Sequence, residues 1–201
     1  MHKSCDFSRV VVLLLAALIA FAACAPAKPV FKGTDISGVE WGGDFELTAH
    51  TGKRVRASDF QTKVVVLFFG YTHCPDICAP ALVKLASLQK QLGADAERVQ
   101  VLFVTVDPGH DTVKQLAGFV PKFHPSFLGL TGSAQEIAQV ARDYKVAYAA
   151  NPKDASGQVL IDHSGGMMVK DATGKLRLLW KNDASVDDLA HDVRLLLKER
   201  G

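Results

Sequence analysis

Two cysteines, Cys74 and Cys78, lie just after a run of apolar residues and have the chemistry of nucleophiles and soft-metal ligands. The run Val64–Phe69 is β-branched and aromatic, which predicts a buried strand. Gly70 and Pro75 interrupt it, and the residues after Pro75 predict a helix. A helix N-terminus favours the anionic form of a nearby thiol and lowers its pKa. Because thiolates attack disulfides and bind soft metals, the pair is predicted to be the functional centre.

The C-x-x-x-C spacing determines how the two sulfurs relate to each other. Positions i and i+4 of a helix share a face, so both sulfurs can reach one metal ion or bond to each other. The spacing differs from the C-x-x-C of dithiol oxidoreductases. Soft thiolates select copper(I), zinc or iron–sulfur clusters; trigonal copper needs a third ligand and structural zinc a fourth. His163, in a polar glycine-containing stretch, is the candidate third ligand, and the alternative is a surface or capping histidine.

Apolar segments with strand character alternate along the chain with segments of helical periodicity. This order indicates an α/β protein with a partly parallel central sheet. The predicted strands cover residues 45–48 (with a hairpin partner at 55), 64–69, 99–106, 127–130, 159–163, 167–170 and 176–180. The predicted helices cover residues 80–92, 112–120, 133–144 and 185–198, and a polar loop is predicted before residue 159.

The N-terminus has the pattern of an export signal. Basic residues precede an almost unbroken apolar run from Val10 to Ala23, which is shorter than the ~20 residues of a membrane span. Small residues before Cys24 resemble the lipobox of bacterial lipoproteins, so Cys24 is predicted to become the lipidated first residue of the mature chain. Phe21 stands where a lipobox usually has leucine. Cleavage at a nearby small-residue site and an uncleaved anchor are therefore the alternatives.

Composition and cysteine usage describe one ordinary domain behind this leader. With Cys5 and Cys24 in the leader, the body keeps only one pair, too few for a disulfide scaffold. The 23 Lys and Arg nearly balance the 21 Asp and Glu and form no basic stripe, so nucleic acid is not an expected partner. We expect a signal peptide at 1–23, a tether at 24–43 and a folded domain at 44–201. The expected location is the periplasmic side of a bacterial membrane, with a lipid or N-terminal anchor.

Three short motifs follow one another in a fixed order. They are FGYTHCPDIC at 69–78, TVDP at 105–108 with Asp111-Thr112, and DHS at 162–164. Together they resemble the Sco/SenC/PrrC family, over the chain from about Asp44 to the C-terminal helix. One departure is Ala79, because the family usually has proline directly after the second cysteine; here the helix start is expected to shift slightly.

The resemblance implies a thioredoxin-like fold, with a central mixed sheet flanked by helices and an N-terminal β-hairpin. It also implies that Cys74, Cys78 and His163 bind copper, as Cu(I) or Cu(II). The implied role is assembly of the copper A centre of cytochrome c oxidase, with the copper-binding subunit of the oxidase and other copper chaperones as partners. Asp107 matches a family position and is expected to orient His163, as carboxylates do for metal-bound histidines. Its alternative role is to begin a turn before proline.

Two functions of different classes are consistent with these residues. The first is a copper metallochaperone. The second is a thiol–disulfide oxidoreductase that uses Cys74 and Cys78 to reduce the cysteines of the oxidase subunit or of other exported proteins. His163 discriminates between them, because a reductase has no need of it. A peroxiredoxin-like peroxidase is disfavoured because no arginine lies near Cys74, and His73 and His110 are predicted to be loop or surface residues.

Overall fold

The computed structural model describes residues 29–153, 159–163 and 166–199, and between 150 and 163 it describes the backbone alone. The chain divides into two units, Met1–Val30 and Phe31–Gly201, and the second contains the sheet and the cysteine pair. The predicted signal peptide and Cys24 lie outside the described residues. No helix within the described ranges is long and apolar enough to cross a membrane.

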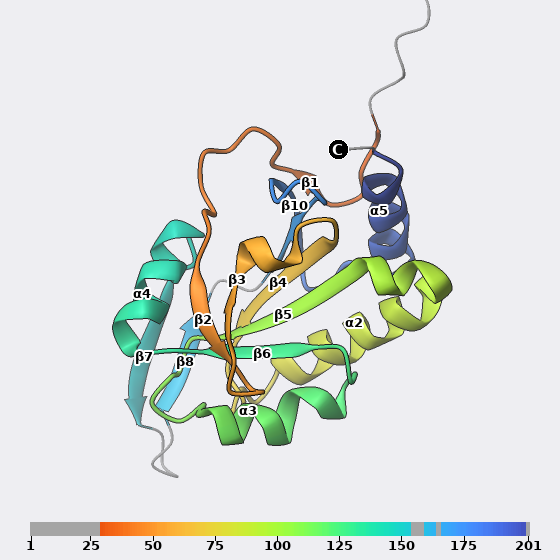
Figure 1. Cartoon of the computed structure of the whole chain (residues 1–201). Helices are drawn as coiled ribbons and strands as arrows, with labels where there is room; N and C mark the ends of the chain where they lie inside the picture. Colours follow the sequence, from red (N-terminus) through yellow and green to blue (C-terminus); the bar gives the residue numbers. More distant parts are fainter. Residues whose placement is uncertain (1–28, 154–158, 164–165, 200–201) are drawn as a thin grey trace, which may run out of the picture. The chain divides into compact units, whose positions relative to one another are not determined.

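An eight-stranded mixed sheet forms the centre of the second unit, in the order β1-β10-β9-β4-β5-β6-β2-β3 (Figure 1). Strand β4 pairs in parallel with β5, and β5 with β6, while the other neighbours are antiparallel. The strands are β1 (Thr34–Asp35), β2 (Glu46–Ala49), β3 (Arg54–Arg56), β4 (Val64–Gly70), β5 (Val99–Thr105), β6 (Leu128–Thr131), β9 (Met167–Lys170) and β10 (Leu176–Trp180). Strands β7 (Tyr148–Lys153) and β8 (Val159–His163) form a separate antiparallel hairpin.

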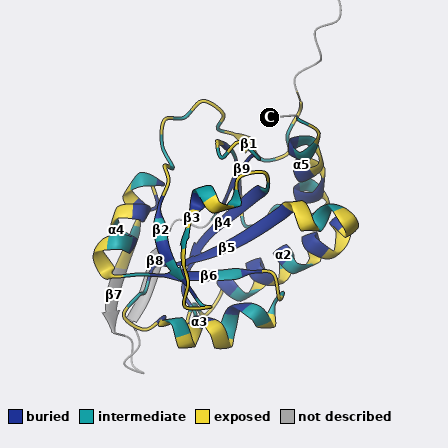
Figure 2. Cartoon of the chain, in the orientation of Figure 1, coloured by how far each residue is buried: buried dark blue, intermediate teal, exposed yellow. Residues whose placement is uncertain are grey.

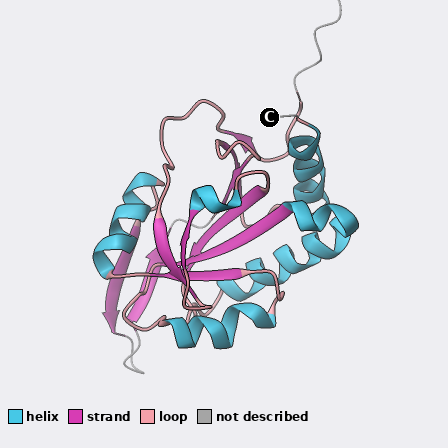
Figure 3. Ribbon diagram, viewed as in Figure 1, coloured by secondary structure: helices cyan, strands magenta, loops and turns pink. Residues whose placement is uncertain are grey.

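Helices cover both faces of this sheet (Figure 3). They are α2 (Cys78–Leu92), α3 (Val113–Phe119), α4 (Ala134–Asp143) and α5 (Val186–Lys198), with short 3-10 helices at Ala57–Phe60, Gly93–Arg98 and Val120–Lys122. Side chains alternate across a strand, so β4 supplies both faces. Its residues 64, 66 and 68 pack with α2, α3 and α5, and residues 65, 67 and 69 pack with α4. Both central strands are buried along their whole length (Figure 2), which explains their unbroken apolar sequences.

The α/β class, the mixed sheet flanked by helices and the N-terminal hairpin β2–β3 are confirmed. Three details differ from the sequence expectations. Residues 148–153 form β7 rather than a loop, because pairing with β8 decides their conformation. Helix α2 begins at Cys78 rather than Pro80. Proline is tolerated in the first turn because a backbone N–H at this position would have no partner within the helix. Residues 31–43 belong to the compact unit and include β1, so the folded domain begins before residue 44.

Candidate metal centre

The two thiols lie where β4 ends and α2 begins. Cys74 is in the connecting loop 71–77, and Cys78 is the first residue of α2. Cys74 is half-buried and packs against the apolar clusters of both sheet faces, whereas Cys78 is only 1% exposed. Both are thiols and not a disulfide, and their side chains are hydrogen-bonded to each other. The carboxyl end of a central strand is where open α/β sheets bind ligands.

Gly70, the last residue of β4, provides the space for the second thiol. A Cβ atom on this residue would lie 2.7 Å from Sγ of Cys78 and 2.8 Å from Cε2 of Phe103. Such distances are far inside van der Waals contact, so only glycine lets the sulfur pack directly on the strand backbone.

The electrostatics of Cys78 are dominated by its burial. Burial raises the pKa of the Cys78 thiol well above its ordinary value, and the neighbouring Cys74 and Asp111 raise it further. A hydrogen bond with the backbone of Tyr71 acts in the opposite direction but is weaker. The expected lowering of the pKa at the helix N-terminus is therefore wrong for Cys78, because desolvation of the thiolate outweighs the helix dipole. A metal that binds this sulfur must displace its proton.

A buried carboxylate, Asp111, fixes the loop that carries Cys74. The Thr72 backbone N–H donates to it at 3.0 Å, the Thr72 hydroxyl donates at 2.5 Å and the Thr105 hydroxyl at 2.7 Å. Thr72 lies in the cysteine loop and Thr105 ends β5, so Asp111 joins the two neighbouring loops at this edge of the sheet. Sequence reasoning assigned Asp111 no role. Its only signal in the sequence was its place in the motif TVDP at 105–108 with Asp111-Thr112.

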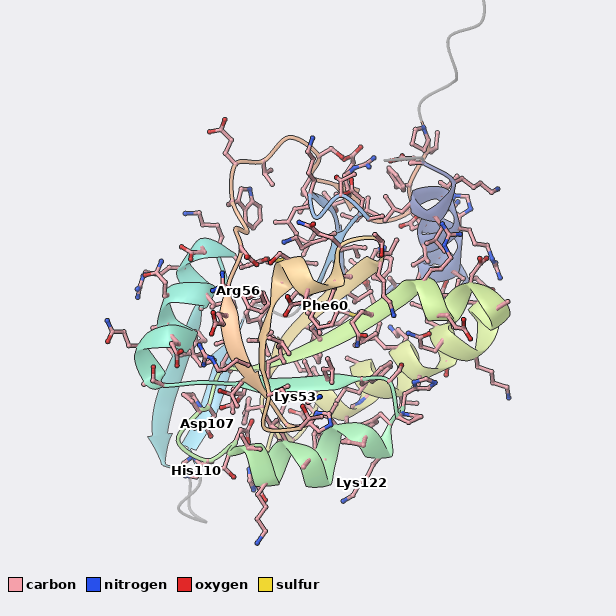
Figure 4. The ribbon with its side chains drawn as sticks, in the orientation of Figure 1. Lys53, Arg56, Phe60, Asp107, His110 and Lys122 are labelled. Atoms are coloured by element: carbon pink, nitrogen blue, oxygen red, sulfur yellow. The ribbon has the colours of Figure 1, made fainter. Side chains whose placement is uncertain are left out.

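Asp107 lies in the loop after β5, but the partner described for its side chain is His110. The two carboxylate oxygens are 2.9 and 3.0 Å from Nδ1 of His110. Figure 4 shows the two labelled residues close together in this loop. The predicted contact of Asp107 with His163 remains a prediction, because the side chain of His163 is outside the described residues.

The backbone places His163 at the same edge of the sheet as the cysteines. It ends β8, where it pairs with Tyr148. Four residues later, Met167 begins β9 and lies opposite Phe68, near the end of β4. The start of β9 and the end of β4 therefore lie at one edge of the sheet. Tyr148, the backbone partner of His163, packs against one of the two apolar clusters that Cys74 also contacts.

The donors present fit a soft metal ion. Two adjacent thiols supply sulfur ligands, and the close approach that Gly70 permits holds one of them in place. Among the described side chains, no three histidine, cysteine or acidic residues converge on one point. His163, whose side chain is outside that set, is the third ligand predicted from the sequence.

Comparison with known proteins decides the family. A family model described as SCO1/SenC matches residues 34–198. The chain belongs to the SCO1/SenC family. It is 44% identical over 154 residues to the bovine mitochondrial protein SCO2 homolog, covering 76% of this chain and 58% of the bovine protein. The chain thus spans less than two thirds of that relative.

Solved structures of the family share the fold. The crystal structure of Arabidopsis thaliana ScoI with copper bound has a TM-score of 0.72 and 36% identity, covering 79% of this chain and 99% of that one. The solution structure of apo Sco1 from Thermus thermophilus has a TM-score of 0.75 and 38% identity, covering 85% and 99%. The thioredoxin-like fold implied by the sequence resemblance is confirmed.

Proposed function

We propose that this SCO1/SenC protein is a copper-binding metallochaperone that assists assembly of the copper A centre of cytochrome c oxidase. The observation that carries the proposal is the pair of hydrogen-bonded thiols of Cys74 and Cys78 at the end of β4, on the sheet edge to which His163 returns. Two sulfurs and one imidazole suit copper in either oxidation state. The Arabidopsis relative with copper bound supports the same cargo.

Each residue contributes a separate property to copper binding. The half-buried Cys74 gives the ion access from solvent, and the buried Cys78 binds only after it loses its proton. His163 completes a three-coordinate site. Asp111 keeps the loop of Cys74 in position. Delivery then requires ligand exchange, which the partly exposed Cys74 can begin with a thiolate of the copper-binding oxidase subunit. Other copper chaperones are the proposed source of the ion.

A Cu(I) titration under anaerobic conditions tests this function. We expect the reduced protein to bind one Cu(I), and the form with a Cys74–Cys78 disulfide to bind at least tenfold more weakly. Added apo oxidase subunit should then remove the ion. Equally tight binding by the oxidised form would overturn the ligand assignment, and failure of the subunit to take up the ion would overturn delivery.

A second function, thiol–disulfide oxidoreductase, is favoured by the unequal exposure of the two thiols. Cys74 is accessible enough to attack, while Cys78 is buried behind it. The Cys74 thiolate would attack a disulfide of the partner and form a mixed disulfide. The Cys78 thiolate would then displace the partner, which leaves as a dithiol, and the Cys74–Cys78 disulfide remains. The variant C78S should trap the mixed disulfide with an oxidised oxidase subunit; no trapped complex on non-reducing gels would argue against reduction.

We propose that the protein acts at the periplasmic side of a bacterial membrane. The support is the apolar leader at 1–23, the small residues before Cys24 and the segment that follows them. A single acyl chain holds a protein to a membrane only marginally, so stable anchoring needs the several chains of a lipoprotein. C24A should remain unlabelled when cells are grown with a radioactive fatty acid, whereas the unaltered chain is labelled. Equal labelling of both would refute lipidation at this residue.

A further inference from the structure

Two exposed histidines stand close together beside the loop of Cys74. His73 immediately precedes Cys74, and His110 lies in the loop after β5. Their ring centres are 6.5 Å apart, with the rings inclined at 68°. His110 and its partner Asp107 project at the lower edge of the domain in Figure 4. Residues 37 positions apart in sequence thus bring two imidazoles to one surface point.

A chain of hydrogen bonds sets the tautomer of His73. The Thr72 hydroxyl donates its proton to the acceptor-only carboxylate of Asp111. The same hydroxyl oxygen lies 3.1 Å from Nδ1 of His73, so it accepts a hydrogen bond from that nitrogen. The proton of a neutral His73 is therefore on Nδ1, and the lone pair that binds metals is on Nε2.

The carboxylate of Asp107 sets the same tautomer in His110. It has no proton to give when ionised, so Nδ1 of His110 must be the donor. The side chain of Asp107 is only 15% exposed, whereas that of His110 is 65% exposed. This is the carboxylate–histidine arrangement that orients imidazoles toward a metal through Nε2 and makes them better ligands.

We propose that His73 and His110 form a second metal site, for a divalent transition metal and above all Cu(II), at the rim of the thiol centre. Metal–nitrogen bonds of about 2.0–2.1 Å place the ring centres of two ligating imidazoles roughly 5–6.5 Å apart, close to the observed separation. Imidazole nitrogen suits Cu(II), and Asp107 adds a nearby negative charge. That copper is the physiological ion rests on the proposed function.

This histidine site would hold its metal ion less tightly than the thiol centre. Within the described part of the chain, His73 and His110 supply two nitrogen ligands. Asp107 is engaged in orienting His110, so water would fill the other coordination positions of the metal. Such a site binds and releases its ion readily. Its place one residue before Cys74 suits capture of the ion before the thiols take it up.

The test uses the full chain in which all four cysteines are replaced, C5S/C24S/C74S/C78S, so that Cu(II) has no thiol to oxidise or bind. This protein should bind one Cu(II), with an electron paramagnetic resonance spectrum of nitrogen and oxygen ligands and no thiolate charge-transfer band. Adding H73A/H110A should lower the Cu(II) affinity at least tenfold. Adding H191A, which removes an exposed histidine of α5, should leave the affinity unchanged. Circular dichroism would verify that all variants are folded.

Failure of this site and failure of the proposed function give different results. If the thiol-free protein binds no Cu(II), or binds it equally well without His73 and His110, the second site is refuted. Cu(I) titration of the chain with intact thiols and H73A/H110A should still give one tightly bound ion. Loss of that ion would also refute the second site as a separate one, because the two histidines would then belong to the thiol centre.

Discussion

The buried carboxylate of Asp111 accepts a hydrogen bond from the backbone N–H of Thr72 at 3.0 Å, across 39 positions of sequence. This contact fixes the start of the cysteine loop to the loop that follows β5. Tyr71, Cys74 and Ile77 of this loop pack against the apolar clusters of the sheet faces, and the hydrogen bonds to Asp111 add a polar connection to them. The position of Cys74 is thereby set from a neighbouring strand as well as from β4.

Replacing Asp111 by asparagine should destabilise the protein and weaken copper binding. One oxygen of the carboxylate becomes an NH2 group, which cannot accept from Thr72 or Thr105. We expect a loss of about 1–3 kcal/mol in the free energy of unfolding, measured by urea denaturation. The matched control is D76N, an exposed carboxylate in the same loop, which should change neither property. Equal behaviour of D111N and D76N would show that Asp111 does not hold the loop.

Replacing Gly70 by alanine should displace the second thiol. The new methyl group would overlap Sγ of Cys78 and the ring of Phe103, and overpacking of this kind costs about 1–3 kcal/mol of stability. Cu(I) affinity should fall with it. Gly118, in α3, is the control, because a Cβ there meets nothing within 4 Å and alanine is the better helix former. G70A with the stability and Cu(I) affinity of G118A would contradict the packing described for Cys78.

Stability should fall at alkaline pH because of Cys78. Burial raises the pKa of its thiol in the folded state, whereas in the unfolded chain it titrates near about 8.5. The folded state thus keeps a proton that the unfolded state loses. This contribution is complete below the unfolded pKa and declines as pH rises above it, by at most about 1.4 kcal/mol per pH unit. Urea denaturation of the apo protein and of C78A should differ by a constant amount at pH 6–7 and converge above pH ~9; a constant difference throughout would contradict the raised pKa.

Local pattern was sufficient for the elements that carry the site. The apolar run of β4 and the periodicity of α2 and α5 follow from burial on sheet faces, so sequence alone located both thiols at the strand–helix junction. Contacts distant in sequence were not predictable. Residues 31–43 have the glycine and proline content of a tether, yet Asp192 accepts hydrogen bonds from the backbone N–H groups of Lys32 and Gly33, 160 and 159 positions away.

The hydrogen-bond partners of the polar side chains at the site could not be predicted from the sequence for the same reason. Asp107 and Asp111 both follow β5 closely, and sequence favoured the first as an orienting carboxylate. In the structure the carboxylate of Asp107 contacts His110, whereas the carboxylate of Asp111 accepts hydrogen bonds from the two threonines. Which of two nearby carboxylates turns inward depends on the loop path after the strand, and the residue types alone do not determine that path.

The ligand set of Cys74, Cys78 and His163 is tested most directly by the Cu(II) absorption spectrum of H163A beside that of the unaltered chain. Imidazole suits Cu(II), whereas two thiolates alone can hold Cu(I) in near-linear geometry. We therefore predict that H163A loses or strongly shifts the thiolate-to-copper charge-transfer band while it keeps most of its Cu(I) affinity and the unfolding temperature of the apo form. An unchanged Cu(II) spectrum would remove His163 from the site and leave a dithiol protein of the reductase kind.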